Sequence, residues 1–198
     1  MTAIPWALVL LRAALAPVIL MLAVFYPSGA AFGTCLVAAL LSDIFDGVIA
    51  RRLGVATNTL RRLDSAADSL FYLAATFAVW QLHPGAITSR WIPLIVLGVL
   101  ELVRYGVDLA KFNREASYHM WSSKAWGVAL FAGFFSLLAL GQDNAIVDLM
   151  IYVGIVADIE GLAISLTLRR WRTDVPTIAH ALRMRVEGTA ASRAPRSP

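Results

Sequence analysis

The sequence predicts an all-α, polytopic integral membrane protein with about six transmembrane helices. Of its 198 residues, 59% are hydrophobic and 15% are charged, whereas about 25% of the residues in a typical soluble domain are charged. The mean hydropathy is +0.71. The apolar residues gather in stretches of about 20, the length that an α-helix needs to cross the hydrocarbon core of a bilayer.

Six such stretches are predicted to span the membrane. The first contains Arg12, whose charge would cost about 2.5–3.5 kcal/mol at mid-membrane, so we expect its side chain to face the protein interior or a polar cavity. The predicted spans are residues 4–25, 31–51, 64–82, 91–107, 125–140 and 146–168.

Residues 1–170 are predicted to form the membrane-embedded domain, and residues 171–198 a basic cytoplasmic tail. Trp171 among arginines is typical of an interfacial anchor. Residues 176–185 predict a short amphipathic helix, and residues 188–198 are expected to be disordered. The net charge of +4 is better explained by loop arginines and anionic lipid headgroups than by binding of nucleic acid.

Residues 43–68 hold four aspartates in two pairs. Asp43 and Asp46 are three positions apart, and Asp64 and Asp68 are four apart. On helices, both spacings place the two side chains on one face. A short turn between the helices would bring the pairs together, and four carboxylates that close repel each other unless cations lie between them. An oxygen-only cluster of this kind suits Mg²⁺ or Mn²⁺.

The segment resembles the signature of the CDP-alcohol phosphotransferase family (class I phosphatidyltransferases), D-x2-D-G-x2-A-R-x8-G-x3-D-x3-D. The matching residues are Asp43, Asp46, Gly47, Ala50, Arg51, Asp64 and Asp68. Leu60 stands where the signature has its second glycine, and its added bulk would narrow the pocket or shift the turn. The alternative is a pair of amphipathic helix ends whose acids face water, but acids within a membrane domain are functional by default.

This resemblance implies a transferase of substituted phosphate groups in phospholipid biosynthesis. It implies a donor that is CDP-diacylglycerol or a similar CDP-alcohol, a small acceptor with a free hydroxyl, release of CMP, and a homodimer. Two Mg²⁺ or Mn²⁺ ions would be held by Asp43, Asp46, Asp64 and Asp68, and Asp68 is also the candidate catalytic base. Gly47, Ala50 and Arg51 would bind the cytidine diphosphate.

The acceptor is less clearly indicated. Arg12, Arg104 and Lys124 are the predicted acceptor-binding residues, and they would suit a phosphorylated acceptor such as glycerol 3-phosphate. The context Leu63-Asp64-Ser65 is more similar to the branches that use serine or an inositol phosphate.

Each of these roles also has a structural alternative. Arg104 could pair with Glu101 three positions away, and Lys124 could extend to the membrane surface. Asp158 and Glu160 are expected to be counter-ions of Arg12 or Arg104. A non-catalytic, cation-coupled membrane protein is the alternative from another class, but we find no inverted repeat and the acids gather at one membrane face.

The distribution of basic residues predicts the orientation. With a cytoplasmic N-terminus and six alternating spans, residues 51–62, the loop at 111–124 and the tail all lie in the cytoplasm. Arg90 is then the only Lys or Arg outside the spans on the far side. This asymmetry follows the positive-inside rule and predicts an inner or plasma membrane protein whose active site faces the cytoplasm.

Labelling of single cysteines tests this orientation. Cys35 is the only cysteine, so a Cys35→Ser background allows Thr57→Cys, Gly85→Cys and Ala190→Cys to be probed one at a time. In intact cells, an impermeant thiol reagent should label only the Gly85 position, while permeabilised cells should show labelling at all three. Strong labelling at position 57 in intact cells would contradict the predicted topology.

Overall fold

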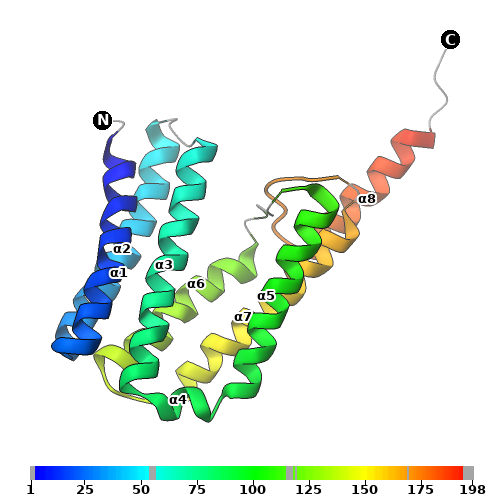
Figure 1. The fold of residues 1–198 in the computed structure, drawn as a ribbon. Coiled ribbons are helices and arrows are strands. Elements are labelled where there is room, and N and C mark those ends of the chain that lie inside the picture. The colour runs from blue at the N-terminus through cyan, green and yellow to red at the C-terminus, as the bar shows by residue number, and fades with distance from the viewer. Residues whose placement is uncertain (1–2, 54–56, 115–117, 119, 169, 194–198) are drawn as a thin grey trace. The chain divides into compact units, whose positions relative to one another are not determined.

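The computed structural model describes residues 3–53, 57–114, 118, 120–168 and 170–193. The side chains of Ala3, Ala50, Arg51, Leu53, Asn58, Arg61 and residues 186–193 lie outside that description. The described residues form no β-strand, and the predicted all-α class is confirmed (Figure 1). The helices are α1 (Ala3–Phe25), α2 (Gly29–Leu53), α3 (Asn58–Leu82), α4 (Pro84–Thr88), α5 (Trp91–Phe112), α6 (Trp121–Phe134), the π-helical η1 (Phe135–Ala139), α7 (Ala145–Thr167) and α8 (Ile178–Arg193).

Among the described residues, four helical stretches are long and apolar enough to cross a membrane, and the expected count of about six is not confirmed. The four are Ile4–Phe25, Gly29–Ile49, Trp121–Ala139 and Ala145–Thr167. Helices α3 and α5 have comparable lengths of 25 and 22 residues. They are more polar because α3 carries Asp64 and Asp68, and α5 carries Glu101, Arg104, Asp108 and Lys111.

The third helix starts earlier than predicted. Helix α3 begins at Asn58 because Thr57 caps it: the Thr57 hydroxyl accepts a hydrogen bond from the Leu60 amide at 3.2 Å, as N-cap threonines do. Asp64 and Asp68 therefore follow the first turn of α3 and do not lie at its start. At the other end of the chain, α8 continues to Arg193, past the predicted end at residue 185. The expectation of disorder is therefore wrong for residues 188–193, while residues 194–198 lie outside the described residues. The division of the chain into domains at residue 170 stays a prediction.

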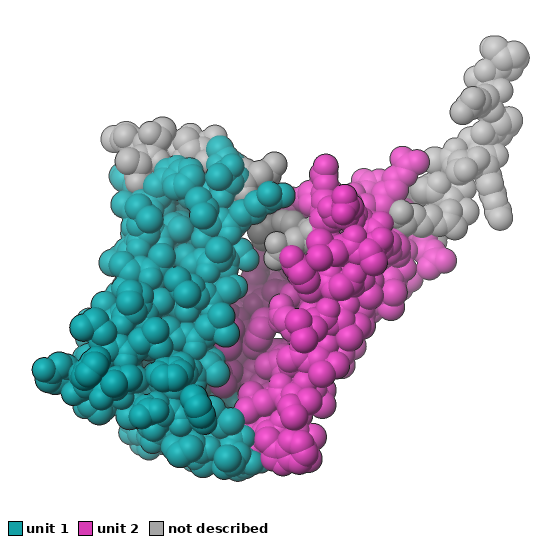
Figure 2. All heavy atoms as spheres, viewed as in Figure 1, with its two compact units in different colours: residues 1–89, 131–147 teal, residues 90–130, 148–198 magenta. Residues whose placement is uncertain are grey.

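The chain divides into two compact units (Figure 2). Unit 1 comprises residues 1–89 and 131–147, and unit 2 comprises residues 90–130 and 148–198. In unit 1, α1 packs against both α2 and α3, and Ile19, Phe32 and Phe71 are each at most 1% exposed.

Unit 1 also contains a close contact between α2 and η1. A Cβ added at Gly29 would collide with the backbone carbonyl of Ala139, and one added at Gly33 would lie 3.3 Å from the Phe135 ring. These glycines are one helical turn apart, so they form a flat strip on which η1 can pack, a common device where helices meet in membranes.

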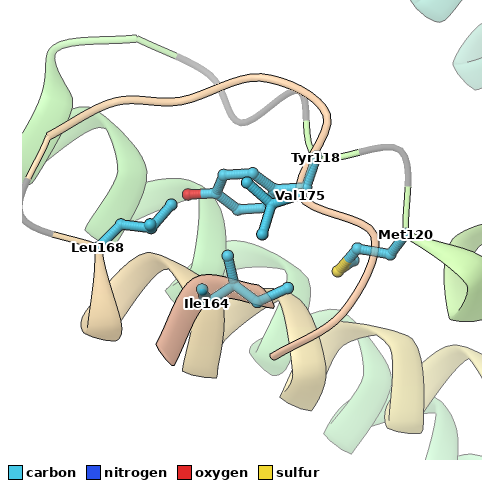
Figure 3. Close-up of a cluster of buried hydrophobic side chains, with 6 residues drawn as sticks. Tyr118, Met120, Ile164, Leu168 and Val175 are labelled. Atoms are coloured by element: carbon cyan, nitrogen blue, oxygen red, sulfur yellow. The ribbon is translucent and has the colours of Figure 1, made fainter. Parts of the chain in front are cut away.

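Unit 2 has a buried apolar cluster of Tyr118, Met120, Ile164, Leu168, Val175 and Ala181 (Figure 3). The cluster joins the end of α7 to the segments that precede α6 and α8. At the starts of α5 and α7, Arg90 donates a hydrogen bond to Asp148 at 2.5 Å. At their ends, the Lys111 ammonium donates to the carbonyls of Ser165 and Leu166 at 2.8 and 2.9 Å. Helices α5 and α7 are therefore parallel.

Candidate functional site

Unit 1 brings the four predicted aspartates to one place. Asp43 and Asp46 lie in the last turns of α2, and Asp64 and Asp68 lie in the first turns of α3. Since α2 ends at Leu53 and α3 begins at Asn58, the chain reverses over a few residues and the two pairs face each other. The spacing argument from the sequence therefore predicted this arrangement correctly.

The centre of this acidic cluster is occupied by Arg12 of α1. Its side chain is 1% exposed, so the expectation that it faces the protein interior is confirmed. Its guanidinium forms salt bridges with all four carboxylates: Asp46 at 2.7 Å, Asp64 at 2.9 Å, Asp43 at 3.3 Å, and Asp68. One positive charge faces four negative charges, so the cluster keeps an excess of negative charge that would attract further cations.

The four carboxylates differ in their access to solvent. The side chains of Asp43, Asp64 and Asp68 are 48%, 32% and 35% exposed, whereas that of Asp46 is 6% exposed. The three accessible aspartates each offer an oxygen atom, and these atoms lie within 4.8 Å of one another. Asp46 does not belong to that group and faces Arg12 from the buried side.

The donor set fits a hard divalent cation. Carboxylate oxygens are the ligands that Mg²⁺ and Mn²⁺ prefer, and here three of them converge from two helices whose positions are fixed by packing. No nitrogen or sulfur ligand belongs to the described group, which argues against a zinc site. Asp43, Asp64 and Asp68 are therefore the residues that could share an ion. A role for Asp46 and the number of ions stay predictions.

Ser42 was not identified by the sequence analysis. It is 2% exposed, accepts a hydrogen bond from Arg12 Nε at 3.3 Å, and donates one to the Ala39 carbonyl at 2.7 Å. Ser42 and Asp46 are four positions apart and share a helix face, a spacing that could have placed this serine beside the cluster.

Leu60 lies away from solvent. It is 5% exposed and packs with Val9 and Ala67, with Ala13 alongside. Its bulk therefore fills the contact between α1 and α3. Two of the predicted CDP-binding residues, Ala50 and Arg51, have side chains outside the described residues, and Gly47 directly follows Asp46 in α2. Their roles stay predictions.

Arg104 belongs to unit 2 and has two acidic neighbours. It pairs with Glu101 at 3.1 Å and with Asp158 at 3.4 Å, and the Asp158 side chain is fully buried. A Cβ added at Gly161 would lie 2.9 Å from Arg104 Cδ, so this glycine makes room for the arginine. The structural alternative that Arg104 pairs with Glu101 is confirmed, as is the expectation that Asp158 pairs with Arg12 or Arg104. Nothing in these contacts tests the acceptor role of Arg104.

Lys124 and Glu160 have different partners within unit 2. The Lys124 ammonium lies 4.6 Å from the centroid of the Trp121 ring, a cation–π distance. Glu160 accepts hydrogen bonds from the Ser122 hydroxyl at 2.6 Å and from the Ile178 amide at 3.2 Å. Glu160 thus ties the starts of α6 and α8 together, and the acceptor role of Lys124 stays a prediction.

A family model described as CDP-alcohol phosphatidyltransferase matches residues 2–169. No curated protein and no solved structure matches the chain. The matched residues include α1 to α7, the acidic cluster and Arg12. Proteins of this family transfer a phosphatidyl group from a CDP-alcohol in phospholipid biosynthesis and use divalent metal ions. The chain therefore belongs to the CDP-alcohol phosphatidyltransferase family.

Proposed function

We propose that the protein transfers a phosphatidyl group from CDP-diacylglycerol to the free hydroxyl of glycerol 3-phosphate and releases CMP. The observation that carries this proposal is the gathering of all four signature aspartates in unit 1, three of them accessible to solvent. The family match supports the reaction class. The lipid donor, the acceptor, the homodimer and the cytoplasmic orientation are the parts that go beyond it.

Asp43, Asp64 and Asp68 would hold divalent ions, with Asp46 contributing from the buried side. Two Mg²⁺ or Mn²⁺ ions at this position would neutralise the diphosphate of the donor and the charge of the departing CMP. The proposal is supported by the convergence of three carboxylate oxygens within 4.8 Å and by the excess negative charge around Arg12.

The position of the cluster suits a lipid donor. Asp43 and Asp46 lie near the end of Gly29–Ile49, the stretch of α2 that is long and apolar enough to cross a bilayer, and Asp64 and Asp68 lie in the first half of α3. A donor could therefore keep its acyl chains in lipid while its headgroup reaches the carboxylates. Gly47, Ala50 and Arg51 would border the cytidine diphosphate, where a guanidinium can bind phosphate oxygens bidentately.

Asp68 is the proposed base. The acceptor hydroxyl attacks the phosphorus next to the diacylglycerol, its proton passes to the Asp68 carboxylate, and the bond from phosphorus to the CMP oxygen breaks. Asp68 is suited to this step because its side chain is 35% exposed and lies one helical turn from Asp64. A carboxylate in such a position can act as a general base.

Arg104 and Lys124 belong to unit 2, and their binding of an acceptor phosphate stays a prediction from the sequence. Arg104 is 23% exposed and already faces two carboxylates, whereas Lys124 contacts an aromatic ring. Serine and an inositol phosphate are the competing acceptors.

One observation supports alternating spans, and a second supports the proposed cytoplasmic orientation. The parallel arrangement of α5 and α7 is the one that alternating fourth and sixth spans require. Arg90, the single basic residue assigned to the far side, pairs with Asp148, which reduces its conflict with the positive-inside rule. The site would then face the compartment that holds soluble nucleotides and phosphorylated acceptors.

Release of CMP tests the proposed reaction directly. Purified protein in mixed micelles with CDP-diacylglycerol and Mn²⁺ should release CMP when glycerol 3-phosphate is added, more rapidly than with serine or an inositol phosphate. The Asp148→Asn variant, which removes a carboxylate of unit 2, should retain this activity. Faster release with another acceptor would replace glycerol 3-phosphate, and no release with any acceptor would contradict the proposed function.

Metal binding tests the ligand assignment. Asp43→Asn and Asp64→Asn should each weaken Mn²⁺ binding by about tenfold or more, since loss even of an outer-shell partner typically costs about 10–100-fold. Binding can be followed by the electron paramagnetic resonance signal of free Mn²⁺, with Asp148→Asn as the matched control. Unchanged affinity in both cluster variants would remove these residues from the site.

Substitution of Asp68 tests its role as a base. Asp68→Asn keeps the size of the side chain and one oxygen ligand but loses basicity, and loss of a general base typically lowers turnover by about 10²–10⁴-fold. The variant should still bind CDP-diacylglycerol, with Mn²⁺ affinity weakened but not abolished. Turnover within a few-fold of wild type at saturating Mn²⁺ would show that Asp68 is not the base.

A further inference from the structure

The carboxylates that are proposed to hold divalent ions are the same groups that Arg12 contacts. Its guanidinium forms salt bridges with Asp43, Asp64 and Asp68, and these three form the converging group of oxygen ligands. The guanidinium has no lone pair with which to bind a cation. Arg12 and divalent ions therefore depend on the same negative charges.

The position of Arg12 is fixed by its neighbours on α1 and α2. Val9 and Ala13 flank Arg12 on α1 and pack against Leu60 and Ala67 of α3. This contact fixes the position of α1 along the axis of α3. From α2, the Ser42 hydroxyl accepts a hydrogen bond from Arg12 Nε. The four carboxylates and the Ser42 hydroxyl thus surround a guanidinium that is 1% exposed. The Arg12 side chain is therefore held in one position by its neighbours.

We propose that Arg12 is the built-in counter-ion of the acidic cluster. It holds the four carboxylates together before divalent ions bind, and it yields its contacts with Asp43, Asp64 and Asp68 as they bind. Arg12 thereby weakens the affinity of the site for divalent ions and stabilises the fold in their absence. This role rests on the proposed metal site and differs from binding of an acceptor phosphate.

Two opposing effects decide whether loss of Arg12 raises or lowers the affinity of the cluster for divalent ions. Without Arg12, no positive charge would offset the four carboxylates. A divalent ion would then be attracted more strongly, because charges interact strongly in a partly buried site. The carboxylates would also repel each other more, which would loosen the site. We expect the first effect to dominate because α2 and α3 are held in place by other packing, including that of Phe32 and Phe71.

The experiment compares Arg12→Gln with the wild type in Mn²⁺ binding and in thermal unfolding. The variant should bind Mn²⁺ about fivefold more tightly or better, within the usual range of coupling between linked sites. In EDTA its unfolding midpoint should fall by about 5 °C or more, because removal of one partner leaves buried charges unpaired. Saturating Mn²⁺ should raise the midpoint further in the variant than in the wild type.

Two more variants sharpen the test. Arg12→Lys keeps the charge but not the planar fork that reaches several carboxylates, so its Mn²⁺ affinity should lie between those of wild type and Arg12→Gln. Arg12→Lys also shows whether Arg12 weakens Mn²⁺ binding if Arg12→Gln does not fold. Arg90→Gln, which removes an arginine from the Asp148 pair in unit 2, should leave Mn²⁺ affinity unchanged.

The outcomes separate this inference from the proposed function. If wild type binds Mn²⁺ but the Arg12 variants bind it equally or more weakly, Arg12 is not a competing counter-ion and the metal site stands. If neither wild type nor the Arg12 variants bind Mn²⁺, the metal site and this inference fail together, while CMP release still reports separately on the reaction class.

Discussion

The mutual repulsion of four carboxylates, balanced by one buried arginine, is the constraint on which unit 1 depends. Arg12 contacts residues of both α2 and α3, so its charge offsets the repulsion between the carboxylates at the place where the three helices meet. Removal of one partner from a buried ion pair typically costs about 3–5 kcal/mol. The same excess of negative charge that makes the arrangement costly would attract divalent ions, so stability and proposed function share one origin.

This constraint also explains why the helices differ in polarity. The helical stretches that meet the length and hydropathy of membrane spans include α1, because Arg12 is its single charged residue. One inward-facing charge with partners can be tolerated in such a helix. Helices α3 and α5 carry several charged residues each, and these find partners within their units: Asp64 and Asp68 with Arg12, and Arg104 with Asp158. Charged residues that have a role in the site or in packing thus lower the mean hydropathy of a helix, and the number of spans counted by hydropathy falls.

The acidic cluster was predictable because helix periodicity converts sequence spacing directly into a shared face. To bring the pair Asp43 and Asp46 next to the pair Asp64 and Asp68, the chain needs only two helices joined by a short turn. The partner of the cluster was less predictable, since Arg12 precedes Asp43 by a whole helix and could equally have faced Asp158. Leu60 illustrates the same limit: its position in the signature suggested a changed pocket, whereas its side chain packs against Val9 and Ala67.

The sequence by itself determined the all-α class, the approximate helix boundaries, the acidic pairs and the family, because composition, periodicity and signature spacing are local properties. Only the tertiary structure decided that Arg12 lies among all four carboxylates, that Ser42 joins them, that Asp46 is buried while three neighbours are accessible, and that Asp158 pairs with Arg104. These outcomes depend on how α1 is rotated and shifted against its neighbours. That choice is made by close packing of side chains distant in sequence, which no local pattern encodes.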